Sequence, residues 1–347
     1  MTRPQDDELS YPLDGQPDDG EFMAVEPGLL WIRLALPYRL NHVNVWAVEG
    51  STGWTIVDTG LDDPRTRTAW EHLLAGALGG RPVTRVIATH FHPDHIGLAG
   101  WLVERTGAGF ACGLTDWLLA RALKTDNSAG QMAAMERFYR RAGLDSTALA
   151  AVLGRGNAYA RAVHEVPSTL TRLRHGDAVE IGAAPWRVIV GGGHTPEPVC
   201  LFRPGDRPVL ISGDQVLPRI SPNISVWANE PDADPLTDFL ASFEPLLKLP
   251  DDVLVLPSHG RPFHGLHRRL DALRRHHEER LDEIAALCAT PRTAARIAEA
   301  LFPPDLDAHQ MVFAVGEAIA HLNHLVRRGA LTRTPGPDGA DLYAADL

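Results

Sequence analysis

Short apolar runs rich in β-branched residues recur through the first three quarters of the chain and predict buried β-strands. The predicted strands span residues 28–36, 44–48, 54–57, 83–88, 109–112, 177–181, 186–190, 208–213 and 253–258. Gly50 and Gly53 suit a hairpin turn between the second and third of these strands. The pattern predicts a fold that opens with a β-meander and continues with strands separated by helices.

Apolar residues at helical spacing fill the longer gaps between these strands. Residues 65–76 predict a helix before the strand at 83–88, and residues 97–103 predict a helix start after it. Residues 114–164 carry helical spacing with few β-branched residues, and we interpret them as a helical insertion. Long additions beside an active site often form lids or substrate walls, but helices that only pack on the sheet fit the same pattern.

From residue 266 onward the pattern becomes helical and predicts a separate C-terminal part. The predicted helices span 268–289, 293–301 and 309–328, and a two-stranded wing follows around a Pro-Gly-Pro-Asp-Gly turn. The first residues of the chain are polar and acidic. We therefore expect a disordered segment at 1–21, a main domain at 22–265 and a small C-terminal domain at 266–347.

The composition is that of a globular protein, with 44% hydrophobic and 22% charged residues among 347. The net charge of −11 argues against nucleic acid as a partner, and residues 266–347 hold ten arginines and no lysine against twelve acidic residues. The three cysteines form no CxxC arrangement, so neither a disulfide framework nor a thiolate zinc site is predicted. We expect a cytoplasmic protein that acts on a small molecule and has no membrane partner, because no signal peptide or transmembrane run is visible. A homodimer is one possible assembly.

Residues 89–97, Thr-His-Phe-His-Pro-Asp-His-Ile-Gly, place three imidazoles and one carboxylate within six positions. His90 and His92 can leave a strand end on the same side and bind one metal. Asp94 and His95 follow a proline that turns the chain, so we expect them to face a second metal nearby. A histidine-rich surface loop is the alternative, because the chain contains 16 histidines. Zinc is the default ion for such residues, although iron or manganese can occupy them.

The string from His90 to His95 resembles the HxHxDH signature of the metallo-β-lactamase-fold hydrolases. The resemblance implies an α/β fold, a four-layer αββα sandwich, with a helical insertion and further ligands at strand ends. Asp58 matches an aspartate that supports the site in this family. The implied ligands of two zinc ions are His90, His92 and His194 for one, Asp94, His95 and His259 for the other, and Asp214 between them.

The finer resemblance is to the glyoxalase II and lactamase-like protein 2 types, and the C-terminal part resembles the winged-helix tail of the latter. After the third histidine the family usually continues with glycine and a second histidine, whereas this chain has Glu197 and Pro198. The main subclass of class B β-lactamases uses a cysteine ligand and no bridging aspartate. Antibiotic hydrolysis is therefore disfavoured by Asp214.

These matches imply a binuclear metal-dependent hydrolase in which a metal-bridging hydroxide attacks a carbonyl and Asp94 or Asp214 handles the proton. No separate general acid is evident, so thioesters, esters and lactones rank before amides. Arg219, Asn223 and Trp227, in the loop after Asp214, are candidate substrate contacts. Two alternatives stay open, which are a mono-iron persulfide dioxygenase with the same ligand string and a ribonuclease of the lactamase-like protein 2 type.

Overall fold

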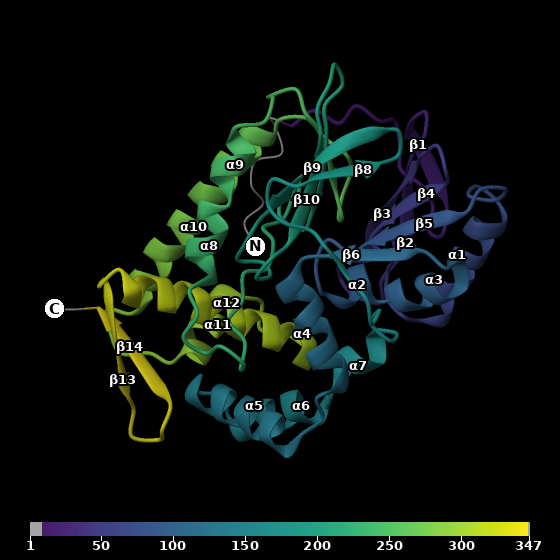
Figure 1. The fold of residues 1–347 in the computed structure, drawn as a ribbon. Helices are drawn as coiled ribbons and strands as arrows, with labels where there is room; N and C mark the ends of the chain where they lie inside the picture. Colours follow the sequence, from purple (N-terminus) through teal and green to yellow (C-terminus); the bar gives the residue numbers. More distant parts are fainter. Residues whose placement is uncertain (1–8, 346–347) are drawn as a thin grey trace.

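The computed structural model describes residues 9–345 and contains two β-sheets that face each other (Figure 1). The first sheet has seven strands in chain order, which are β1 (Phe22–Glu26), β2 (Leu29–Ala35), β3 (His42–Glu49), β4 (Trp54–Val57), β5 (Val83–Ile87), β6 (Gly109–Cys112) and β7 (Thr171–Arg172). The second sheet, in the order β12-β11-β10-β9-β8, contains β8 (Ala178–Ile181), β9 (Ala184–Val190), β10 (Val199–Arg203), β11 (Val209–Gly213) and β12 (Leu254–Pro257). Every strand predicted from the sequence is present, and β1, β7 and β10 are additional.

Apolar side chains form one layer between the sheets and one layer outside each sheet. Trp31 of β2 packs in the central layer with Trp186 of β9. Ile32, the next residue of β2, points the other way, into the layer beneath α1 (Pro64–Ala75) and α3 (Ala99–Thr106). Successive side chains of a strand point to opposite faces, so a strand buried on both sides reads as a continuous apolar run. The result is the predicted helix-sheet-sheet-helix arrangement.

The layer outside the second sheet is built by three distant parts of the chain. Val255 of β12, Phe138 of the insertion and Leu270 of α10 (Leu266–Leu287) belong to one apolar cluster. Two short helices, α8 (Pro235–Ala241) and α9 (Phe243–Leu247), complete this side. Because α10 covers the second sheet and also begins the C-terminal part, the expected boundary at residue 265 does not separate two cores.

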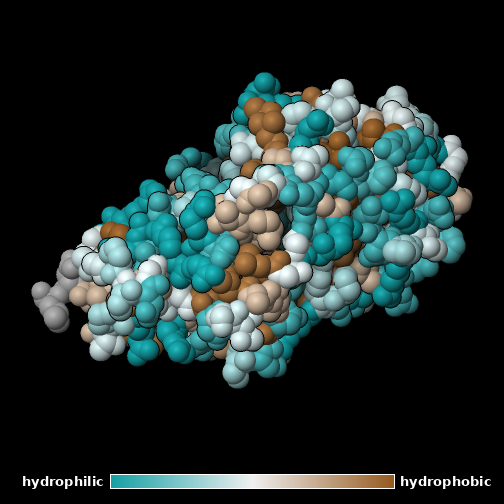
Figure 2. Space-filling view, turned by 90° about the horizontal axis from the view of Figure 1, so that it is seen from below, coloured by the Kyte–Doolittle hydropathy of each residue, from teal (hydrophilic) through white to brown (hydrophobic). Residues whose placement is uncertain are grey.

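The predicted insertion is helical apart from short connecting segments. It consists of α4 (Leu114–Thr125), α5 (Ala129–Arg141), α6 (Ser146–Gly154) and α7 (Ala158–Ala162). Phe138 and Tyr139 are buried in the cluster that includes the C-terminal helices, so α5 has a packing role. Leu118 and Met132 are exposed, and on the face seen from below Figure 2 shows apolar residues gathered near the middle and bordered by hydrophilic ones.

The C-terminal part continues with two more helices and an antiparallel pair of strands, in the predicted order. These elements are α11 (Ala294–Leu301), α12 (Ala308–Arg327), β13 (Leu331–Pro335) and β14 (Asp341–Ala345). Leu331 and Tyr343 join the same cluster as α10, so the strand pair packs onto the helices. Among the helices of residues 9–345, none has the length and apolar composition to cross a bilayer.

The prediction that residues 1–21 are disordered is wrong for residues 9–21. Ser10 and His264 exchange two backbone hydrogen bonds of 3.2 and 2.8 Å. Leu9 and Tyr11 pack against the apolar layer outside the second sheet. These contacts offset the entropy of ordering the segment, and its acidic composition gave no sign of them. Residues 1–8 lie outside the described residues.

Candidate metal centre

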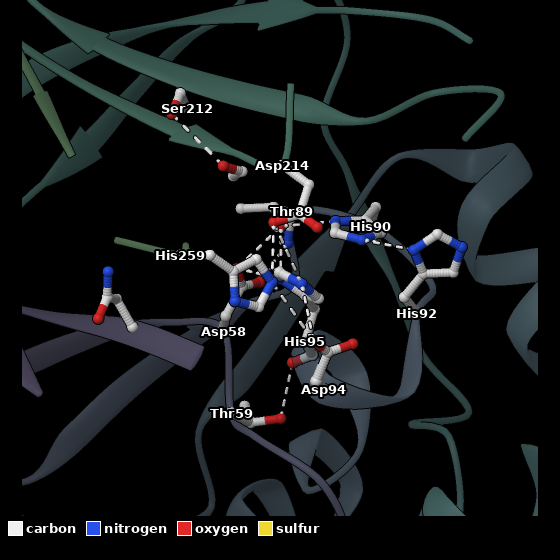
Figure 3. Close-up of polar contacts among 12 residues, drawn as sticks. Asp58, Thr59, Thr89, His90, His92, Asp94, His95, Ser212, Asp214 and His259 are labelled. Atoms are coloured by element: carbon white, nitrogen blue, oxygen red, sulfur yellow. Dashed lines mark hydrogen bonds and ion pairs between the residues drawn. The ribbon is translucent and has the colours of Figure 1, made fainter. Parts of the chain in front are cut away.

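The predicted ligands lie on loops and short turns that follow β5, β9, β11 and β12 and come together in one cluster. Figure 3 shows this cluster and labels every predicted ligand except His194. The chain leaves β5 and reaches His90 three residues later. The predicted tight turn that carries Asp94 and His95 is a one-turn helix, α2 (Pro93–Ile96). Proline at the first helical position fits, because its fixed φ suits a helix start and its missing N–H would have no partner there.

Three imidazoles form the first group of potential ligands. The Nε2 atom of His90 lies 3.0 Å from Nδ1 of His92 and 3.3 Å from Nε2 of His194. Two nitrogens that each lie about 2.0–2.1 Å from one tetrahedral zinc ion are about 3.3 Å apart. The three nitrogens therefore have the spacing that a single metal ion requires.

Asp94, His95 and His259 form the second group, and Asp214 lies between the two groups. The Oδ2 atom of Asp94 is 3.6 Å from Nε2 of His95 and 3.5 Å from Nε2 of His259. The Oδ1 atom of Asp214 is 3.5 and 3.4 Å from the same two nitrogens. Its other oxygen, Oδ2, is 3.4 Å from Nε2 of His194 in the first group. The carboxylate of Asp214 thus presents one oxygen to each group.

Several buried polar atoms of the cluster have no hydrogen-bond partner. Among the described residues, Nε2 of His95 and Oδ1 of Asp214 are buried atoms without a partner, and both point into the space between the imidazoles. Burying such atoms without a partner costs about 1–3 kcal/mol each. A cation at this position would satisfy both atoms. The donor set of imidazole nitrogens and carboxylate oxygens fits divalent metal ions.

The electrostatics of the two groups differ. Burial and neighbouring imidazoles lower the pKa of His90 and His92 well below the ordinary value, so both rings are neutral and present lone pairs. Burial alone would also lower the pKa of His95. The carboxylates of Asp94, Asp214 and Asp58 outweigh burial and raise that pKa to about 10. The second group therefore favours a positive charge at its centre.

Asp58, which was predicted to support the site, is hydrogen-bonded to the loop that carries the ligand candidates. Its carboxylate accepts hydrogen bonds from the backbone N and Oγ1 of Thr89, at 2.7 and 2.8 Å, and from Nδ1 of His95 at 2.8 Å. Asp58 has a φ of 64°, and it is the single residue other than glycine with positive φ in the described part of the chain. This uncommon conformation aims the carboxylate at His95 and fixes which ring nitrogen faces the metal position.

Backbone carbonyls orient the two candidate histidine ligands that follow strands of the second sheet. Nδ1 of His194 donates to the carbonyl of Asn223 at 2.8 Å, and Nδ1 of His259 donates to the carbonyl of His42 at 2.7 Å. Asn44, fully buried on β3, donates to the carbonyls of Pro257 and Gly260 at 2.8 Å each and so clamps the chain on both sides of His259. Each bond leaves Nε2 free to face the metal position.

Sequence reasoning did not identify Asp116 and Tyr159, two residues of the insertion that support the centre. Asp116 is fully buried, and its two oxygens accept from the backbone N of Phe91 at 2.9 Å and of Glu197 at 2.8 Å. The hydroxyl of Tyr159 donates to the carbonyl of Phe91 at 2.7 Å. Phe91 lies between His90 and His92, so both residues fix the ligand loop. Nothing in the sequence around Asp116 marks it as a residue that supports the metal centre.

Glu197, which stands where the family usually has glycine, connects two elements at the rim. Its Oε2 atom accepts from the backbone N of Thr115 at 2.6 Å, and Oε1 pairs with Arg172 at 3.2 Å. The substitution therefore joins the loop after His194 to the start of α4 and to β7.

The three candidate substrate contacts lie in different environments. Asn223 orients His194 through its carbonyl, and its side chain accepts from Ser225 at 2.6 Å. Trp227 is partly buried and packs edge-on against Phe313 of α12, with 5.6 Å between ring centres. The guanidinium of Arg219 lies 5.8 Å from the ring centre of Tyr11. The structure thus joins Asn223 to the metal centre, while substrate contact by any of the three stays a prediction.

Two family models match the chain. One is described as the Metallo-beta-lactamase superfamily and matches residues 38–259, a range that contains every residue of the two ligand groups and Asp58. The other is described as the Metallo-beta-lactamase-like, C-terminal domain and matches residues 281–346.

Three similar proteins extend over much of the chain. The crystal structure of a beta-lactamase domain protein from Burkholderia ambifaria is similar with a TM-score of 0.89 and 42% sequence identity, and the match covers 98% of each chain. The probable metallo-hydrolase YqjP of Bacillus subtilis (strain 168) is 26% identical over 315 residues, which cover 87% of this chain and 93% of that protein. The acyl-coenzyme A thioesterase MBLAC2 of Bos taurus is 28% identical over 249 residues, which cover 68% of this chain and 79% of that protein. The predicted class of fold is confirmed by these matches.

Proposed function

The chain belongs to the metallo-beta-lactamase superfamily, and on this premise we propose that it is a binuclear metal-dependent hydrolase of thioesters, with esters and lactones as related substrates. The observation that carries the proposal is the position of Asp214, whose two oxygens face two separate ligand groups. A carboxylate placed in this way offsets the repulsion between two cations that lie close together.

Metal ions held by these groups would supply a water of lowered pKa and a Lewis acid for the substrate oxygen. The protein residues then have distinct tasks. Asp94 contacts both imidazoles of its group through Oδ2, which leaves Oδ1 as an acceptor for the proton released in hydrolysis. The hydrogen bonds of Asp58 and Thr89 keep His95 in one orientation while charge changes at the centre.

Two observations favour a thioester over an amide. Every histidine and carboxylate of the two ligand groups is itself a candidate metal ligand, so none of them is a free proton donor for a leaving group, and a thiolate leaves without protonation. The similar MBLAC2 protein is named an acyl-coenzyme A thioesterase. We further propose zinc as the resident ion, because histidine dominates both groups. The relation to glyoxalase II or lactamase-like protein 2 and the winged-helix character of the tail remain predictions.

The proposal is tested by metal analysis and by substrate comparison on the same purified protein. We expect about two zinc ions per chain and faster hydrolysis of thioesters than of the matching amides. One iron per chain together with persulfide oxidation would support the dioxygenase instead. RNA cleavage at low salt without thioester turnover would support the ribonuclease, and either result would contradict the proposal.

A further inference from the structure

Three side chains from distant segments meet in a group that the metal centre does not use. Arg155, at the end of α6, donates from Nη2 to Nδ1 of His309 at 2.8 Å. The ring of His309, in the first turn of α12, stacks on Tyr38 with 4.8 Å between ring centres and 20° between planes. Tyr38 lies in the loop between β2 and β3. We call Arg155, His309 and Tyr38 the rim group.

Each segment of the rim group is anchored to the metal centre four residues further along the chain. Tyr38 precedes His42, whose carbonyl accepts from the metal ligand candidate His259. Arg155 precedes Tyr159, whose hydroxyl donates to the carbonyl of Phe91, between two of the ligand candidates.

The third segment, in α12, is anchored to the metal centre in the same way. One helical turn after His309, the carbonyl of Phe313 accepts from Ser225, whose hydroxyl also bonds to Asn223, the residue that orients His194. Four residues span about 6 Å in a helix such as α12, and at most about 14 Å in segments 38–42 and 155–159, which are not continuously helical. Three independent anchors of this length keep the rim group close to the loops that carry the ligand candidates. In agreement, Asp94 raises the pKa of Tyr38 after the larger effect of burial, and it acts on the pKa of His309 after burial, Arg155 and Asp307.

The rim group carries a positive charge that is not neutralised by an ion pair. In residues 9–345, Arg155 forms no salt bridge with a carboxylate. By contrast Arg39, the residue after Tyr38, pairs with Asp305 at 3.5 Å. Backbone hydrogen bonds from Gln310 and His309 and, more weakly, the charge of Arg155 lower the pKa of Asp307, whose Oδ1 accepts both of these bonds. An arginine without a salt bridge near a metal centre is a local exception in a chain of net charge −11.

The hydrogen-bonding capacity of the rim group is that of a donor site. Burial and the charge of Arg155 lower the pKa of His309, so its ring is neutral, accepts at Nδ1 and donates at Nε2. Burial and Asp94 raise the pKa of Tyr38, so its hydroxyl keeps its proton. A guanidinium, an imidazole N–H and a phenol O–H are therefore carried by one contiguous group of side chains.

The geometry points to an anion-binding site in which Arg155, His309 and Tyr38 hold an acidic group of the substrate beside the metal centre. A guanidinium fits the planar or tetrahedral oxygens of a carboxylate or phosphate and binds them with charge-assisted hydrogen bonds. The inference rests on the proposed function, because it assigns the substrate class as acyl thioesters that carry an acid. The acid can belong to the acyl group or to the thiol, as in coenzyme A.

Matched thioesters test the site. An acyl chain that ends in a carboxylate is compared with its methyl ester, each on coenzyme A and on the uncharged thiol N-acetylcysteamine. In the wild-type protein we expect a higher kcat/KM for the acidic member of at least one pair. Arg155→Gln removes the charge and should lower the acidic-to-neutral ratio by about tenfold to a hundredfold, since a hydrogen bond to a charged group is lost. The pair in which the ratio falls identifies the side of the thioester that carries the acid.

Three further variants make the result specific. Arg155→Lys keeps the charge and should retain most of the ratio. Tyr38→Phe keeps the stacked ring at an exposed position and removes one donor, so it should lower the same ratio even if Arg155→Gln folds poorly. Arg296→Gln on α11 changes an exposed arginine that pairs with Glu299, and its ratio should equal that of the wild type.

Direct binding separates failure of this inference from failure of the proposed function. If no thioester is hydrolysed, calorimetry on the metal-loaded protein still measures how tightly coenzyme A and glutarate bind at the proposed anion site. Weaker binding to Arg155→Gln than to the wild type supports the anion site, even though the thioesterase proposal then fails. Equal binding, or equal acidic-to-neutral ratios in folded wild type, Arg155→Gln and Tyr38→Phe, overturns the anion site and leaves hydrolysis untouched.

Discussion

Asp214 is the residue on which both ligand groups depend. Its two oxygens lie 3.4 Å from His194 on one side and 3.4 Å from His259 on the other. We expect Asp214→Ala to lose at least about a hundredfold in kcat/KM, because even residues that only orient ligands contribute about 10–100-fold. Metal content measured on the same sample should fall as well. Asp206→Ala, at an exposed loop acid, is the control, and near-normal turnover by Asp214→Ala would exclude the bridging role.

Asp58 allows the effect of its carboxylate to be separated from that of its backbone conformation. Asn tolerates positive φ, so Asp58→Asn preserves the 64° conformation but replaces one of the oxygens that accept from Thr89 and His95. We expect metal affinity to fall by about 10–100-fold, measured by competition with a chelator. Asp63→Asn at the N-cap of α1 is the matched control, because Asn caps a helix as well as Asp does. Unchanged affinity in Asp58→Asn would show that the carboxylate does not support the metal ligands.

The residues of the metal centre differ in how far the sequence alone could identify them. His90 to His95 lie within six positions, and the remaining candidates follow apolar strands, so residue type and local context were sufficient. Asp116 and Asn44 were not identifiable. Asp116 meets Glu197 across 81 residues and Asn44 meets Gly260 across 216 residues, and a polar residue acquires such a role only when the fold brings its partner close. The acid and amide side chains carry no local mark of these contacts.

At the scale of elements, α12 connects the C-terminal part to the metal centre. Gly316 packs so closely on the loop after β11 that an added Cβ would lie 2.9 Å from Oγ of Ser225. One residue later, Oε2 of Glu317 accepts from Asn223 at 3.3 Å. The loop that orients His194 is therefore supported by a helix about a hundred residues away in the chain, a contact that no periodicity could predict.

Glu317 makes the stability of this contact depend on pH. Burial raises the pKa of its carboxyl from 4.5 to about 7. The folded protein therefore holds this proton more tightly than the unfolded chain does, and the free energy of unfolding falls as the pH rises from about 4.5 through about 7. Glu317→Gln, which is neutral at every pH, should flatten this fall.

Urea unfolding at about pH 5 and about pH 8 measures the difference. Glu299→Gln, an exposed acid on α11, is the control and should retain the pH dependence of the wild type. A Glu317→Gln protein with the same dependence as the wild type would mean that Glu317 is not protonated in the fold.

Strand and helix positions were predicted well where an element has a long apolar run or clear helical spacing. The missed strands are short or begin beside an acidic segment. β7 has two residues, β10 has four apolar residues between Pro198 and Arg203, and β1 follows the acidic start of the chain. Such strands are specified by their neighbours in the sheet more than by their own sequence.

At the scale of the molecule, the expected division at residue 265 has a physical counterpart in the change from strands to helices but not in the core. Leu266, Leu270, Leu273, Leu281 and Ile284 of α10 are all buried. At about 1.5–3 kcal/mol each, these five side chains contribute about 7–15 kcal/mol, which is comparable to the net stability of a whole domain. Sequence patterns show which residues are apolar, but they do not show which parts of the chain pack together into one core.

The shared core predicts cooperative unfolding of the full-length protein. Calorimetry should record one transition, because the insertion, the second sheet and the C-terminal helices bury a common cluster that cannot open in one part alone. A chain ending at residue 265 should show no cooperative transition, since it leaves Val255 and Phe243 without the helices that cover them. A chain ending at residue 330 is the control. It loses only Leu331 and Tyr343 of the buried cluster and should retain the transition at a lower temperature. Two separate transitions in the full-length protein, or a folded chain of 265 residues, would establish two independent domains.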